Sequence, residues 1–110
     1  MEGRVLPKKT NKHASDPLLW IQALIRSGDY EFSGHVNDYL GAGDFDDDDI
    51  VNSILNGKIK KTEKDEFYGS VNEKKYTIRG RCKNGLLFET VGKLLEDDGE
   101  YYFLITAGKR

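Results

Sequence analysis

The sequence predicts an α+β fold in which two to three N-terminal helices pack on one face of a three- to four-stranded antiparallel sheet. Residues 16–56 have apolar side chains at helical spacing, and after Gly57 the apolar period changes to two. Charge changes sign at the same place. Residues 16–56 hold nine Asp/Glu against one Arg, whereas residues 57–93 hold ten Lys/Arg against five Asp/Glu. Helices followed by a run of strands are typical of this fold class.

The first helix is predicted to begin at Asp16-Pro17, with Asp as N-cap and Pro at the first helical position. It ends at Ser27-Gly28, because glycine favours the left-handed conformation that closes a helix. Its apolar stripe consists of Leu18, Ile21, Leu24 and Ile25. Residues 1–15 are polar and lack periodicity, so we expect a flexible arm ahead of one domain over residues 16–110.

A second helix is expected from Ser33 to about Leu40, with Ser33 as its cap and with His35 and Tyr39 on one face. A third follows the run Asp46 to Asp49, whose carboxylates suit a helix start, and Asn56-Gly57 ends it. The acidic run does not match a calcium loop, because Asp49 stands at position six and Leu55 at position twelve. No metal site is therefore predicted there.

Four strands are expected after Gly57: a lysine-rich edge strand over residues 58–62, then residues 75–82, 86–95 and 101–107. In residues 75–82, Tyr76, Ile78, Gly80 and Cys82 alternate with Lys75, Thr77, Arg79 and Arg81. Lys83-Asn84-Gly85 is a hairpin turn signal.

Composition excludes several classes of protein. The single cysteine, Cys82, rules out an intramolecular disulfide and a Cys-cluster zinc site, and its place in the alternation indicates a small core residue. No stretch approaches the ~20 apolar residues of a membrane span, and no signal-peptide core is present. We expect a cytoplasmic protein that needs no cofactor.

The outward row Lys75, Thr77, Arg79 and Arg81 is the first candidate for chemistry, because alternate strand residues stand about 6.5–7 Å apart. That spacing suits successive phosphates of a nucleic acid, which arginine can bind bidentately. The alternative is that these side chains form a solvent-exposed face of the sheet and pair with cross-strand residues such as Glu89.

Three further groups have both a functional and an ordinary interpretation. Lys109 and Arg110 are a phosphate-neutralising pair or a solubilising tail. His35 is a general acid or base, or a structural histidine. The tyrosines at 76, 101 and 102 stack on bases or belong to the core.

The order of motifs resembles small prokaryotic domains that stand beside toxin–antitoxin modules. Tyr30-Glu31-Phe32-Ser33-Gly34-His35, then Ile54-Leu55-Asn56-Gly57, then Tyr76-Thr77-Ile78-Arg79-Gly80-Arg81 carry this resemblance. The layout is also similar to the MqsR branch of RelE-type toxins: Glu66-Phe67-Tyr68-Gly69-Ser70 resembles its Asp-Phe-Tyr-Lys-Ser run, and Lys109 its C-terminal lysine. Gly69 stands where that branch has a catalytic lysine, so either Lys60, Lys61 or Lys64 replaces it or the activity is lost.

The resemblance implies a RelE-like fold and a metal-independent endoribonuclease that cleaves mRNA and is bound by a cognate antitoxin. His35, Arg81 and Lys109 would be its catalytic residues, and the RNA phosphates would contact Lys60, Lys61, Lys75, Arg79 and Arg110. The alternative function is a non-catalytic acidic module, such as an immunity or antitoxin-type inhibitor of a basic nuclease. The Asp44–Asp49 cluster and the sequence pI of about 5.7 favour this alternative.

Overall fold

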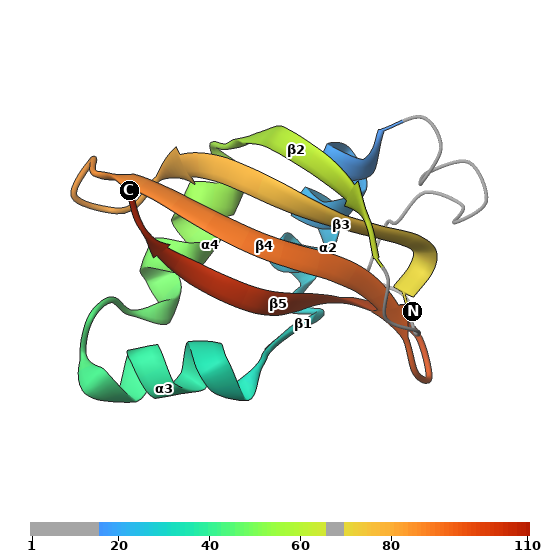
Figure 1. Ribbon diagram of the computed structural model, residues 1–110, viewed down its shortest axis with the longest axis horizontal. Helices are drawn as coiled ribbons and strands as arrows, with labels where there is room; N and C mark the ends of the chain where they lie inside the picture. Colours follow the sequence, from blue (N-terminus) through green and yellow to red (C-terminus); the bar gives the residue numbers. More distant parts are fainter. Residues whose placement is uncertain (1–15, 66–69) are drawn as a thin grey trace.

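The computed structural model describes residues 16–65 and 70–110, which form a layer of helices on a twisted β-sheet (Figure 1). Three helices and a short strand come first, and four longer strands follow. The elements are α2 (Pro17–Ser27), β1 (Tyr30–Phe32), α3 (Gly34–Ala42), α4 (Asp47–Leu55), β2 (Lys58–Lys64), β3 (Ser70–Arg81), β4 (Leu87–Glu96) and β5 (Glu100–Lys109). The expected α+β class is confirmed.

The sheet has five strands in the order β1-β5-β4-β3-β2, and it is mixed. Strands β2 to β5 form the antiparallel meander that the sequence predicts. The expectation of only three or four strands, all antiparallel, is wrong, because β1 adds a parallel partner to β5 through the pair Glu31 and Phe103. A strand of three residues is too short for its alternation of side chains to be recognised in the sequence. It lies at the edge of the sheet beside β5 because the chain passes there between α2 and α3.

The predicted helix ends are confirmed by hydrogen bonds. The Asp16 carboxylate accepts from the Leu19 amide, and the Ser33 hydroxyl accepts from the Val36 amide. Asp46 and Asp49 form a reciprocal capping box at the start of α4. The amides of the first helical turn have no carbonyl partner within the helix and would otherwise bond to water. Each capping side chain takes the place of that water.

The core lies between the helices and one face of the sheet. In Figure 1, α2 and α4 lie behind the sheet, and α3 lies beside β5. Ile50 and Ile54 of α4 are fully buried, as are Ile78 of β3 and Phe88 of β4. Burying each of these side chains contributes about 1.5–3 kcal/mol. Cys82 is 3% exposed, which confirms it as a small core residue.

A β-bulge in β5 changes which way the end of the chain faces. Gly92 pairs with Leu104, but its neighbour Val91 pairs with Thr106, so Ile105 is one residue extra. Alternation is displaced by one residue beyond that point, and Ala107 is buried where an outward residue would otherwise be expected. The side chain of Lys109 therefore points to the helix side of the sheet.

Across the described ranges, 16–65 and 70–110, the structure contains no helix with the length and apolar character needed to cross a membrane.

Candidate nucleic-acid interface

The face of the sheet opposite α2 and α4 carries the predicted basic row. Tyr76, Ile78 and Gly80 are buried against the helices, as expected. The alternate residues therefore point to the other side, which we call the open face. Its side chains on β2 to β5 include Lys58, Lys61, Glu63, Lys75, Thr77, Arg79, Arg81, Leu87, Glu89, Val91, Lys93, Leu95, Tyr101, Phe103, Ile105 and Arg110. Seven of these are Lys or Arg, against two Glu and the carboxylate of Asp65, which contacts Lys93 on this face.

Strand register arranges these side chains in rows across the sheet. Glu63 of β2 pairs with Lys75 of β3, which pairs with Lys93 of β4, which pairs with Phe103 of β5. Directly opposed residues share a face and lie within side-chain contact range. The row therefore places two lysines side by side, with an aromatic ring next to them.

The predicted phosphate-binding arginines already have partners. Arg79 contacts Glu89 through Nε at 2.9 Å and a terminal nitrogen at 2.8 Å, and Arg110 reaches the same carboxylate at 3.6 Å. The guanidinium of Arg81 donates to the Gly85 carbonyl at 2.9 Å, within its own hairpin. This pairing is the alternative that the sequence left open for the basic row. A phosphate bound at Arg79 would have to share the guanidinium group with Glu89.

The lysines are less committed than the arginines. Lys58, Lys60, Lys64 and Lys75 form no ion pair with the residues that the structure describes. Lys61 contacts Glu63 at 3.3 Å, but both side chains are largely exposed, so this pair contributes at most about 1 kcal/mol. Lys60 occupies the irregularity between Ile59 and Lys61 in β2. Among the described residues, lysine charge without an ion pair is therefore concentrated along β2 and the first half of β3, with Lys58 and Lys75 on the open face and Lys64 on the other.

Lys93 is the exception, because Asp65 neutralises it. Their charged atoms lie 3.3 Å apart, and the Asp65 side chain is 1% exposed. The Asp65 amide also donates to the Glu73 carbonyl, next to a bulge in β3. This buried pair joins the end of β2 to the centre of the sheet.

His35 and Lys109 do not lie on the open face. The ring of His35 stands edge-on to Tyr39, 4.7 Å between centroids, as their spacing on α3 predicts. Tyr39 also lines a shallow pocket of about 310 Å³ with Phe45 and Lys109, on the helix side of the sheet. The structure thus brings His35 close to the Lys109 pocket through Tyr39. It does not bring either residue to Arg81, which points the other way.

A polar clamp fixes the basic strand to α4. The Asn56 side chain accepts from the Arg81 amide at 2.8 Å and donates to the Arg81 carbonyl at 2.9 Å, where Asn52 also donates. Asn56 thus forms the hydrogen bonds with β3 that a neighbouring strand would form. It does so at Arg81, which lies beyond the first residue of β2. The Asn-Gly and Gly-Arg motifs are therefore structural: they set where Arg79 and Arg81 emerge.

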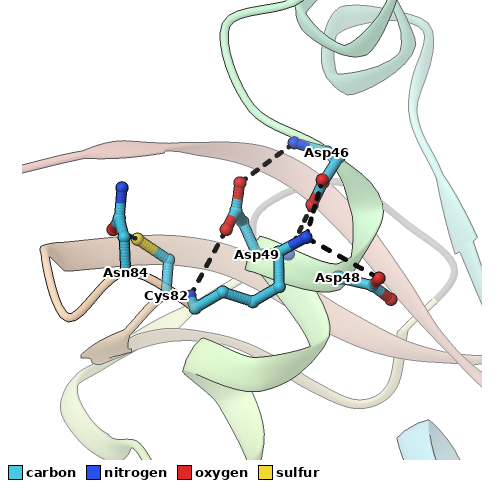
Figure 2. Close-up of polar contacts among 6 residues, drawn as sticks. Asp46, Asp48, Asp49, Cys82 and Asn84 are labelled. Carbon is cyan, nitrogen blue, oxygen red and sulfur yellow. Dashed lines mark hydrogen bonds and ion pairs between the residues drawn. The ribbon is translucent and has the colours of Figure 1, made fainter.

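The acidic run is used in a similar way (Figure 2). Asp46 and Asp48 lie 2.9 and 3.8 Å from the Lys83 ammonium, and Asp49 accepts from the Lys83 amide. The hydrogen bond with Lys83 lowers the pKa of Asp46 and raises the pKa of Lys83. Oxygens of Asp46, Asp47 and Asp48 come within 4.8 Å of one another, but a metal ion would have to displace Lys83. Capping and hairpin docking account for these carboxylates.

Phe103 and Lys93 are site residues that sequence reasoning missed. Alternation from the buried Tyr102 and Leu104 would have placed Phe103 outward, whereas the pairing of Lys93 with Phe103 depends on register. Of the tyrosines considered for stacking, Tyr76 and Tyr102 are buried, and Tyr101 alone stands on the open face.

Two predictions lie outside the described residues: the flexible arm, residues 1–15, and the segment 66–69 that includes Gly69. The chain matches no family model, and comparisons with curated proteins and with solved structures find no match either.

Proposed function

We propose that this protein binds RNA on the open face of its sheet. The observation that carries the proposal is that Lys58 of β2 and Lys75 of β3, both on the open face, form no ion pair with described residues. No described helix covers this face (Figure 1). Lysines bind phosphate as point charges, and releasing counterions from the nucleic acid adds a favourable, salt-dependent free energy.

The rest of the molecule favours the approach of an anion to this face. The acidic run at the start of α4 lies in the helical layer, where Lys83 is its partner. An anionic strand is therefore attracted to one side of the sheet and repelled by the other. The RelE/MqsR resemblance supports mRNA as the natural ligand, with a cognate antitoxin as a protein partner.

Replacing Lys75 with glutamine is expected to weaken RNA binding several-fold and to lower the salt dependence of the affinity by about one unit of log–log slope. Fluorescence anisotropy of a labelled RNA, titrated over a series of salt concentrations, measures both. Arg26→Gln is the matched control, because it removes one cation from an exposed position of α2 and leaves the open face unchanged. Equal losses in the two variants would show that net charge alone drives binding.

Cleavage of RNA is a second candidate function, and the contact of His35 with a residue of the Lys109 pocket is the observation that supports it; the RNA would have to pass round the edge of the sheet from the open face to reach this pocket. His35 is exposed, contacts Tyr39, and is joined through that ring to the pocket of Lys109. In the proposed reaction, the 2′-hydroxyl attacks the adjacent phosphorus and the bond to the 5′-oxygen breaks, leaving a 2′,3′-cyclic phosphate and a free 5′-hydroxyl. His35 would transfer the proton, and Lys109 would stabilise the added negative charge. Arg81, on the other face, would hold RNA outside the reacting centre.

His35→Gln is expected to lower cleavage by about 10²-fold or more, the size of a general acid–base contribution, while the melting temperature changes little. Product analysis of an mRNA incubated with chelator would show the cyclic phosphate. Tyr39→Phe keeps the ring that supports His35 and serves as the control. Absence of cleavage by the unaltered protein, with binding retained, would remove this candidate and leave RNA binding in place.

A further inference from the structure

We propose that the open face selects unpaired strands, with a base stacked on Phe103 while its phosphate lies on Lys75. This inference rests on the proposed RNA binding and specifies the class of ligand. It is carried by a single cross-strand row, in which Lys75 opposes Lys93 and Lys93 opposes Phe103.

The two lysines of this row differ in how far their charges are already paired. The side chain of Lys93 is 12% exposed and its ammonium lies 3.3 Å from the buried Asp65 carboxylate. Lys75 forms no ion pair with a described residue; Glu63, across from it on β2, contacts Lys61 instead. Lys75 is therefore the member of this row whose charge is left for a phosphate.

The ring next to them stands among apolar neighbours. Phe103 is half-buried on the open face, and Tyr101 lies two residues before it on the same side of β5. Val91 and Leu95 border it from β4. Aromatic rings beside cationic side chains are the arrangement by which proteins bind single strands without reading base edges.

Geometry separates an unpaired strand from a duplex at this site. β3 and β5 are two strand spacings apart, about 9.5 Å. An unpaired nucleotide can reach across that distance, phosphate at one end and base at the other. In a duplex the bases are stacked inside, so the phosphates can contact the lysines but no base can lie on Phe103.

The test compares four probes by anisotropy at ~50 mM salt, where electrostatic binding is strong: oligoadenylate, its deoxy counterpart, an RNA duplex and a DNA duplex. We expect the single strand to bind more tightly than its duplex. Phe103→Leu, which keeps an apolar side chain but removes the ring, should weaken the single strand about tenfold and leave the duplex unchanged. Leu87→Val is the matched control on the same face, and thermal unfolding verifies that each variant is folded.

The outcomes separate the two proposals. If none of the probes binds, RNA binding itself is wrong. If duplex and single strand bind equally and Phe103→Leu affects neither, binding by lysines stands and the stacking site is overturned. If the deoxy strand binds as tightly as oligoadenylate, the assignment to RNA fails. A loss in Phe103→Leu that is confined to single strands supports stacking.

Discussion

Gly80→Ala is expected to destabilise the protein by about 3 kcal/mol or more, at or above the upper end of ordinary overpacking effects. A Cβ built on Gly80 would lie 1.9 Å from the backbone oxygen of Ser53 and 2.7 Å from the Asn56 side-chain oxygen. The first of these atoms belongs to the backbone of α4, so a rotamer change cannot relieve the clash. Helix and strand would have to separate at the place where the core is fully buried. Domains of this size are stabilised by only ~5–15 kcal/mol.

Gly108→Ala is the control for Gly80→Ala. Gly108 is also a strand residue without a positive φ, and nothing lies within 4 Å of the Cβ that alanine would add. We expect its free energy of unfolding, measured in urea, to stay near that of the unaltered protein. Comparable losses in the two variants would show that α4 can move away from β3 at little cost. The close approach of α4 to β3 would then not be needed for stability.

The clamp also connects stability to the proposed function. Asn56 holds the Arg81 backbone through two hydrogen bonds, and Gly80 sets how closely α4 approaches. A shift of α4 would therefore move Arg79 and Arg81 on the open face. Gly80 thus acts from the buried face of the sheet, whereas the side chains of Arg79 and Arg81 lie on the open face.

Local signals allowed most of the fold to be predicted. Asp16, Ser33 and Asp46 cap helices as expected, because a side-chain oxygen next to unpaired amides has the same effect in any fold. The alternation in β3 is confirmed from Lys75 to Arg81. The strand begins five residues earlier than predicted, where a bulge and the positive φ of Glu73 hide the period. Local patterns are lost where the backbone departs from regular geometry.

The candidate site was harder to predict, since it depends on register. Sequence order places Lys109 at the end of the basic row, and β5 does run beside β4 as expected. One extra residue at Ile105 then turns Lys109 to the helix side, where it opposes Phe88. Whether Arg79 is free also depends on register, which sets Glu89 directly across from it. Neither fact can be read from residue spacing along one strand.

Lys93→Met is expected to destabilise the protein by about 3 kcal/mol, the effect of breaking a buried ion pair from one side. The ammonium of Lys93 is a partner of the Asp65 carboxylate, whose side chain is 1% exposed, and methionine would withdraw that charge while keeping most of the packing. Removing one member leaves the other charge poorly solvated, which costs more than the pair contributes when intact. Urea unfolding of the variant measures the loss.

Lys61→Met is the matched control, because its ion pair with Glu63 has nearly the same length, 3.3 Å, but side chains that are 63% and 41% exposed. Water solvates Glu63 when Lys61 is lost, so the expected change is at most about 1 kcal/mol. The double variant Lys93→Met/Asp65→Leu should recover part of the loss, since an apolar pair needs no counter-charge. If Lys93→Met costs no more than Lys61→Met, Asp65 does not depend on Lys93. The contacts of Asp65 other than Lys93 would then be enough to hold its carboxylate.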